Sequence, residues 1–204
     1  FAHIEAYGGD PILTLNENFQ KDPREGKINL SIGIYFDDAG RIPVLGCVRE
    51  AEAQMLAAAA TKSYLPIGGD AAMRHAVQAL LFGADAAVLR DGRVATLQTV
   101  GSSGGLKVGA DFLKRINPGA KVLISDPSWE NHRALFESAG FKVENYPYYD
   151  AKTKGVDFTG MLGALNAAPA GTVVVLHACC HNPTGYDITS ERWSQVVQAV
   201  KARG

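Results

Sequence analysis

The residues Val173-Val174-Val175-Leu176 give the clearest indication of the fold of this 204-residue sequence. Consecutive apolar residues without polar alternation are typical of a strand that is buried on both faces, as in a mostly parallel sheet. Polar residues follow from His177 onward. We therefore predict a buried strand over 172–179 that ends in a polar loop.

Strands and helices alternate outward from this stretch. The patterns predict further strands at 94–100, 121–125 and 141–146. They also predict a short helical stretch that opens at 10–13, a long helix from Pro43, and helices at 70–82, 104–116, 129–139, 158–167 and 190–201. Such alternation is typical of α/β architecture, in which helices flank a mostly parallel sheet. Ligands of such sheets bind beyond the carboxyl ends of the strands.

Composition excludes several classes of function. The sequence has 20 basic and 21 acidic residues, so nothing in its charge favours nucleic acid or an anionic membrane as a partner. No apolar run approaches the roughly 20 residues that cross a bilayer. Cys47, Cys179 and Cys180 form no disulfide framework, and the last two lie in the predicted buried strand. We expect reduced thiols in a cytoplasmic protein.

The segment Gly101-Ser102-Ser103-Gly104-Gly105 lies between a predicted strand and a predicted helix. Glycines permit a tight turn, and the helix start and two hydroxyls offer hydrogen-bond donors to a phosphate. The spelling matches neither G-x-G-x-x-G nor a P-loop. A plain strand-to-helix connection explains the segment equally well.

The segment from His177 to Gly185 reads His-Ala-Cys-Cys-His-Asn-Pro-Thr-Gly. A strand would place His177, Cys179 and His181 on one face, where they could bind zinc. Because the sequence has no second group of such ligands, we expect no metal. Asn-Pro-Thr-Gly predicts a sharp turn, either purely structural or holding the Asn182 amide at the end of the strand.

The segment from Asp126 to His132 reads Asp-Pro-Ser-Trp-Glu-Asn-His and also follows a strand. Trp129 could stack on a flat ligand ring, or it could be a core residue that covers the sheet. All three segments follow strands, where an open sheet builds its site. Together they offer phosphate donors, an aromatic ring and an amide, which suit a planar phosphorylated cofactor.

These segments, in this order, resemble the class I (aspartate aminotransferase) family of pyridoxal-phosphate-dependent enzymes, and the resemblance runs along essentially the whole chain. Residues 29–33, 64–66 and 107–115 are most similar to bacterial aromatic-amino-acid (tyrosine) aminotransferases. The resemblance implies the type I fold of these transferases. It also implies an arm at 1–9, the beginning of a small domain at 10–42, and the first part of a large cofactor-binding domain at 43–204.

The resemblance also implies roles for individual residues. Ser102 and Ser103 would bind the cofactor phosphate, Trp129 would stack on the ring, and Asn182 would donate to its phenolic oxygen. Tyr64 would reach the phosphate in a second subunit, so the active unit would be a homodimer with shared sites. Gly33 and Ile34 would line the substrate pocket with Trp129 and Asn182. His132 and His177 would lie behind the ring and support an acidic partner of the pyridine nitrogen. Pro127 and Pro183 would follow cis peptide bonds.

The lysine that forms a Schiff base with the cofactor in this family would lie after Gly204, because no Ser-x-Ser-Lys segment occurs here. We therefore expect a longer protein, and the 204 residues alone would be inactive. The predicted reaction moves the amino group of an aromatic (and acidic) L-amino acid to a 2-oxo acid. An aspartate aminotransferase and a non-catalytic fragment that keeps part of the cofactor surface are the alternatives. A nucleotide-binding domain is disfavoured, because no acidic ribose-binding residue stands where one is needed.

Overall fold

The structure is a computed structural model that describes residues 2–3, 11–31 and 33–204. The chain forms two compact units, Phe1–Ser63 and Tyr64–Gly204. The first unit contains α1 (Pro11–Lys21) and α2 (Gly46–Ala58). The arm expected at 1–9 falls almost wholly outside the described residues, and the division into arm, small and large domains stays a prediction.

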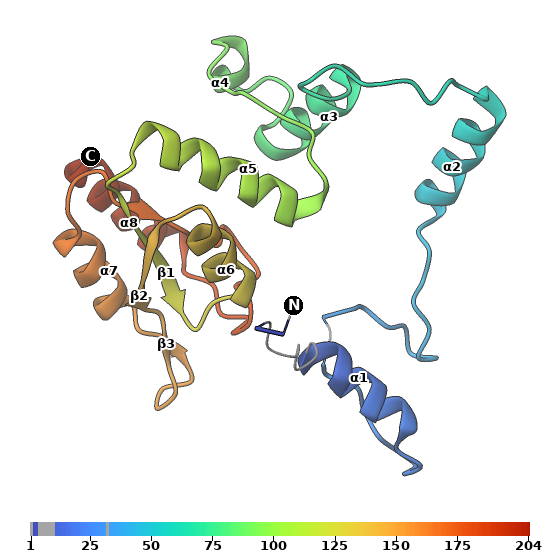
Figure 1. The fold of residues 1–204 in the computed structure, drawn as a ribbon, viewed down its shortest axis with the longest axis horizontal. Helices are drawn as coiled ribbons and strands as arrows, with labels where there is room; N and C mark the ends of the chain where they lie inside the picture. Colours follow the sequence, from blue (N-terminus) through green and yellow to red (C-terminus); the bar gives the residue numbers. More distant parts are fainter. Residues whose placement is uncertain (1, 4–10, 32) are drawn as a thin grey trace. The chain divides into compact units, whose positions relative to one another are not determined.

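The second unit is built on a parallel sheet, as predicted (Figure 1). Its strands lie in the order β2 (Lys142–Pro147), β1 (Lys121–Asp126), β5 (Val173–Val174). Central β1 pairs in parallel with both neighbours. A small antiparallel hairpin of β3 (Tyr149–Asp150) and β4 (Gly155–Val156) follows β2.

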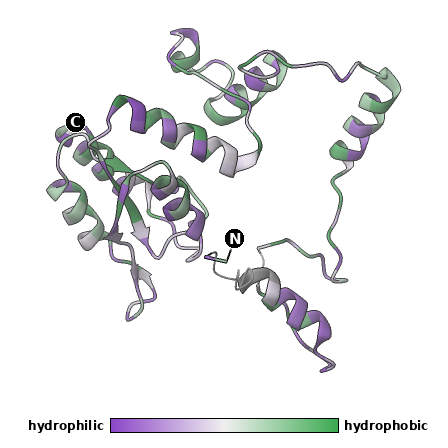
Figure 2. Cartoon of the chain, viewed as in Figure 1, coloured by the Kyte–Doolittle hydropathy of each residue, from purple (hydrophilic) through white to green (hydrophobic). Residues whose placement is uncertain are grey.

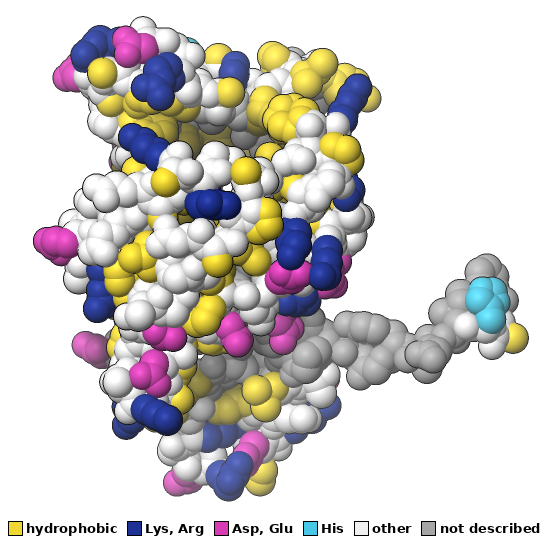
Figure 3. Space-filling model, turned by 90° about the vertical axis from the view of Figure 1, so that its left-hand side faces the viewer, with side chains coloured by type: hydrophobic (Ala, Val, Ile, Leu, Met, Phe, Trp, Pro, Cys, Tyr) yellow, Lys and Arg dark blue, Asp and Glu magenta, His cyan; other side chains and the backbone are white. Residues whose placement is uncertain are grey.

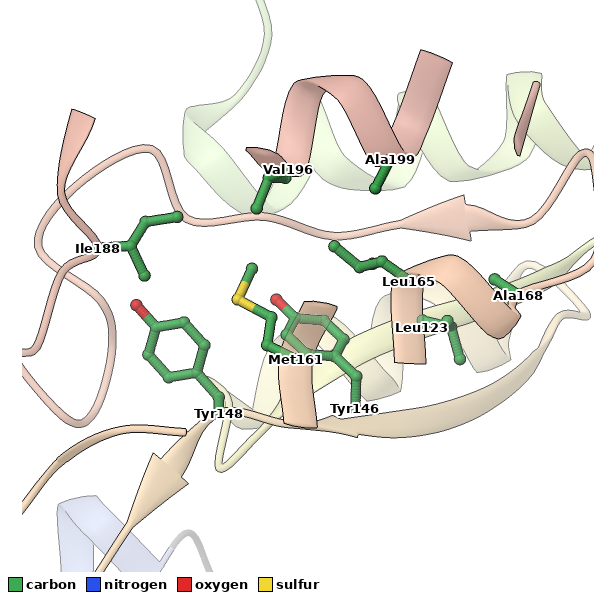
Figure 4. Close-up of a cluster of buried hydrophobic side chains, with 9 residues drawn as sticks. All are labelled: Leu123, Tyr146, Tyr148, Met161, Leu165, Ala168, Ile188, Val196 and Ala199. Carbon is green, nitrogen blue, oxygen red and sulfur yellow. The ribbon is translucent and has the colours of Figure 1, made fainter. Parts of the chain in front are cut away.

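Helices pack against both faces of β1. Val122 and Ile124 contribute to a core with residues of α5 (Gly101–Ile116) and α6 (Glu130–Ser138). Leu123 belongs to a second core with residues of α7 (Phe158–Ala167) and α8 (Ser190–Arg203), shown in Figure 4. Successive strand residues point to opposite faces, so an apolar β1 is buried on both sides. The prediction of an α/β fold with helices flanking a parallel sheet is confirmed.

Two short helices precede this sheet. α3 (Ala71–Phe82) begins as predicted at Asp70, whose carboxylate accepts a hydrogen bond from the Met73 N–H at 2.7 Å. The unpredicted α4 (Ala87–Arg90) follows. Among the described residues, no helix combines the length and hydropathy that crossing a membrane would require.

The prediction of a strand at 94–100 is wrong. The segment is extended but pairs with no strand of the described structure, and its Leu97 and Val100 side chains are exposed. It is fixed instead by the Gln98 N–H, which donates to the Gly68 carbonyl at 3.1 Å. An apolar segment forms a strand only where a neighbouring strand pairs with its backbone N–H and C=O groups.

The strand predicted at 172–179 is shorter than expected. Only Val173–Val174 pairs with β1, and the Val175 N–H adds one hydrogen bond to the Leu123 carbonyl at 2.9 Å. Beyond Leu176 the chain bends away to form the polar loop. Cys179 and Cys180 are therefore exposed free thiols, not members of a buried strand as the sequence suggested.

Candidate functional site

The site lies where β1 ends. The last buried strand residue is Ser125, and a cis peptide bond joins Asp126 to Pro127, as expected from the resemblance. The turn places Trp129 at the start of α6, where it is partly buried beside an open hollow of about 450 Å³. Trp129 is thus a partly exposed residue that lines a hollow, and it does not belong to the core of the sheet.

A series of aromatic rings runs inward from Trp129. The His132 ring meets Trp129 edge-on with centroids 5.3 Å apart, and meets His177 edge-on at 4.9 Å. His177 in turn stacks on His181 at 4.1 Å. Two segments that are 45 residues apart in sequence are therefore in contact at the carboxyl ends of β1 and β5.

Asn182 lies in a turn that several hydrogen bonds hold in place. A cis peptide bond joins it to Pro183, again as expected, and its backbone N–H donates to Nδ1 of His177 at 3.0 Å. The Asp187 carboxylate accepts from the backbone N–H groups of Cys180 and His181 at 2.7 and 2.9 Å. The Asn182 residue itself is exposed, so its amide is available to a ligand.

The histidines of the site are held neutral. Burial lowers the pKa of His132 and of His177 below the ordinary value, and in His132 the neighbouring His177 adds to the effect. Burial, followed by the nearby His177, lowers the pKa of His181 to about 4. The hydrogen bonds from His181 and Cys180 lower the pKa of Asp187. At neutral pH the cluster therefore combines uncharged imidazoles with one carboxylate.

One nitrogen of the cluster, Nε2 of His177, has no hydrogen-bond partner in the described structure. Nδ1 of His177 accepts a hydrogen bond, so the proton of the neutral ring is on Nε2. That Nε2 is buried and has no hydrogen-bond partner among the described residues. A buried donor without an acceptor is costly, which makes this nitrogen a candidate donor to a bound group.

Ser102 and Ser103 lie in the first turn of α5, not in a loop before the helix as predicted. Gly101 begins the helix with φ of +62°, a value that favours glycine. No side chain of the described structure caps this end. The Gly101 N–H donates to the Thr99 carbonyl at 3.0 Å, which leaves the N–H groups of Ser102 and Ser103 to bind an anion. Figure 2 shows the Gly/Ser turn as a pale segment, followed by alternating polar and apolar turns of α5.

The remaining predicted residues belong to other segments of the chain. Tyr64 is fully exposed at the start of the second unit. Gly33 and Ile34 are exposed residues of the first unit, and their role in a substrate pocket stays a prediction. Among the residues that the structure describes, no group of His, Cys, Asp and Glu has the arrangement of a metal site.

Sequence reasoning missed three residues that hold the site together. Ser128 shares a hydrogen bond of 2.9 Å with Nδ1 of His132. The sequence indicates His181 only as a possible metal ligand, and it does not indicate Asp187 at all. Asp187 stands outside the Asn-Pro-Thr-Gly motif and binds backbone groups, and no side-chain pattern in the sequence indicates such contacts.

Comparison with known proteins agrees with this architecture. The family described as aminotransferase class I and II matches residues 25–204. The chain is 56% identical over its full length to an aspartate aminotransferase of Pseudomonas aeruginosa, and 54% identical to an aromatic-amino-acid aminotransferase of Escherichia coli. It covers 51% of each of these relatives, so it spans about half their length.

Solved structures show the same relation. An aromatic amino acid aminotransferase from Burkholderia cenocepacia superimposes with a TM-score of 0.96 at 61% identity, and the chain covers 51% of it. An aromatic-amino-acid aminotransferase from Burkholderia pseudomallei, solved covalently bound to pyridoxal phosphate, gives 0.96 at 57% identity over 51% of its length. The match to the family over residues 25–204, with these similarities over the whole chain, shows that the chain belongs to the class I and II aminotransferase family.

Proposed function

We propose that this chain provides much of the cofactor-binding surface of a pyridoxal-phosphate-dependent aminotransferase. The observation that supports it best is the cluster at the ends of β1 and β5. There, a partly free Trp129 ring, an exposed Asn182 amide and a buried, unpartnered His177 Nε2 occur together. The first turn of α5 adds free backbone donors for a phosphate.

Each residue has a distinct role in this proposal. Ser102 and Ser103 bind the phosphate with N–H and hydroxyl groups, Trp129 covers one face of the ring, and Asn182 donates to its phenolic oxygen. When bound, pyridoxal phosphate supplies an electron-poor ring that withdraws charge from the α-carbon of the amino acid. The protein holds that ring in one plane and excludes water from the face that Trp129 covers.

The neutral histidines have a specific use in this site. His132 and His177 lie behind the Trp129 ring, and burial lowers the pKa of each. A neutral imidazole can donate to a carboxylate and hold it in place without changing the charge of the site. We assign His132 and His177 to the support of an acidic group that faces the ring nitrogen of the cofactor.

A homodimer with shared sites is part of the proposal. Tyr64 is fully exposed and is free to reach a ligand in another subunit. Helices α2 and α3 bury no residue in the described structure, although they carry apolar side chains such as Met55, Leu56 and Leu80. Figure 3 shows exposed hydrophobic side chains in yellow. A stable helix normally buries its apolar stripe, which supports further protein contacts for both helices.

The proposed substrates are an aromatic or acidic L-amino acid and a 2-oxo acid, in the cytoplasm. Relatives named for aromatic amino acids reach 54% identity over the chain, and structures so named reach 61%. Aspartate aminotransferase is the second candidate, because a relative of that name is 56% identical. In both cases the proposal expects the lysine that bonds the cofactor covalently to lie after Gly204.

The test compares amino donors with the complete gene product. Transfer to 2-oxoglutarate is measured for tyrosine, phenylalanine and aspartate, with and without added pyridoxal phosphate. The proposal expects cofactor-dependent turnover of the aromatic donors, with kcat/KM for tyrosine at least comparable to that for aspartate. Turnover of aspartate alone would support the second candidate. Absence of turnover with every donor would favour a non-catalytic cofactor-binding protein.

A further inference from the structure

We infer that His181 is a positioning residue that fixes the ring of His177 and the turn that presents Asn182. This inference rests on the proposed function, because it gives His181 a task only if His177 and Asn182 serve the cofactor. No direct contact between His181 and a ligand is required. The imidazole acts through its two neighbours.

The His181 ring is clamped between two others. Its face stacks on Tyr148 with centroids 3.8 Å apart and planes 10° from parallel. Its other neighbour, His177, stacks at 4.1 Å and 22°. With 2% of its surface exposed, His181 is among the most deeply buried large side chains of the described structure. A ring held on a nearly parallel neighbour limits the rotation of that neighbour, here His177.

Hydrogen bonds fix His181 within its own plane. Nε2 shares a hydrogen bond of 2.9 Å with Ser125 Oγ at the end of β1, and Nδ1 shares one of 2.8 Å with Thr184 Oγ1 in the turn. A neutral imidazole has one donor and one acceptor nitrogen, and hydroxyl groups can satisfy both. His181 thus connects the end of β1 to the turn after Asn182.

The fixed position of the His181 ring determines the orientation of His177. Its Nδ1 accepts the Asn182 N–H at 3.0 Å, which leaves the proton on Nε2. If the plane of the His177 ring is fixed, the direction of that N–H is fixed as well. The groups that influence its protonation are His132, His181 and the Asp187 carboxylate. Loss of the stacking partner would let the ring rotate and take up either tautomer.

The test measures the tautomer of His177 by ¹⁵N NMR of the histidine-labelled, cofactor-free complete gene product, with a His177→Gln variant for assignment. In the unchanged protein we expect one tautomer, with the proton on Nε2. His181→Asn removes the stacking surface and is expected to give mixed tautomers and a lower kcat in the loaded protein. His181→Phe restores a flat ring and is expected to restore the single tautomer. His75→Asn, at an exposed histidine of α3, is the control.

Two results would overturn the inference. One is an unchanged His177 tautomer in His181→Asn, measured well below the Tm of that variant, since a merely structural role lowers Tm alone. The other is a His181→Phe protein as disturbed as His181→Asn. If His181→Asn does not fold, His181→Leu replaces it. This variant fills the buried space without a flat ring, and an unchanged His177 tautomer would again contradict the inference.

The same sample separates this inference from the proposed function. The tautomer of His177 is read without cofactor, so it reports on positioning alone. Failure of the unchanged protein to develop cofactor absorbance with pyridoxal phosphate would refute the proposed function. A bound cofactor with a His177 tautomer that does not depend on His181 would refute only the positioning role.

Discussion

At the scale of single residues, Trp129 is the side chain that we propose to stack on the cofactor ring. It starts α6, one edge of it meets His132, and part of its surface is free at the hollow beside β1. Burial in the sheet core would have left no face for a ligand. Its position favours the stacking interpretation over the structural one.

Trp129→Ala is therefore expected to weaken binding of pyridoxal phosphate. Ring stacking contributes about 0.5–1.5 kcal/mol beyond area burial, which corresponds to roughly a 3- to 10-fold rise in the Kd of the cofactor. Fluorescence or absorbance titration of the cofactor-free complete gene product measures it. Trp129→Phe keeps a ring and should retain most of the affinity. Equal affinity in Trp129→Ala and the unchanged protein would show that the indole does not contact the cofactor.

The residues of the candidate site differ in how well sequence predicts them. Trp129 and Asn182 belong to segments that follow predicted strands, and this position alone predicts that they lie at a ligand site. His181 and Asp187 act by contacts that form only when β1 and the turn meet: a stack on Tyr148, and backbone N–H groups. No local pattern encodes such pairings, because the partners are distant in sequence or are not side chains.

At the scale of elements, α7 shows how a glycine lets a helix start close to a strand. Asp157 accepts a hydrogen bond from the Gly160 N–H at 2.8 Å. A Cβ at Gly160 would lie 2.3 Å from Asp157 Oδ2 and 2.9 Å from Pro147 Cβ, so it would displace the cap or the end of β2. Gly163 of the same helix has no atom within 4 Å of such a Cβ.

These two glycines make a matched pair of variants. Gly160→Ala is expected to lower the free energy of unfolding by about 1–3 kcal/mol, because overpacking strains a filled site. Gly163→Ala is expected to be neutral or to stabilise by up to about 1 kcal/mol, since alanine favours helix. Urea unfolding of the complete gene product measures both. Equal stability of the two variants would contradict the close packing of α7 on β2.

Elements were predictable where local pattern and tertiary contact agree. β1, β2 and the helices that cover them follow from apolar runs, and the start of α3 follows from its cap, Asp70. The segment 94–100 has the composition of a strand but no paired neighbour in the described structure. The predicted end of β5 lies too far along the chain, because apolar residues continue after the last residue that pairs with β1. Strand length depends on the partner, which a single sequence does not reveal.

At the scale of the whole molecule, the chain spans about half the length of the curated relatives it matches. The described structure leaves apolar side chains of α2 and α3 exposed and the His177 Nε2 without an acceptor. These are three separate features, two helix faces and one buried donor, that lack a partner in the described structure. The proposal of a larger, dimeric cofactor enzyme accounts for all three.

The most direct test is the intact mass of the complete gene product after incubation with pyridoxal phosphate and reduction with borohydride. We predict that the complete gene product carries one covalently attached cofactor per chain. A variant with Trp129→Ala should need more cofactor to reach the same labelling. A complete gene product that gains no cofactor mass, at any concentration of pyridoxal phosphate that labels an authentic aminotransferase, would contradict the account.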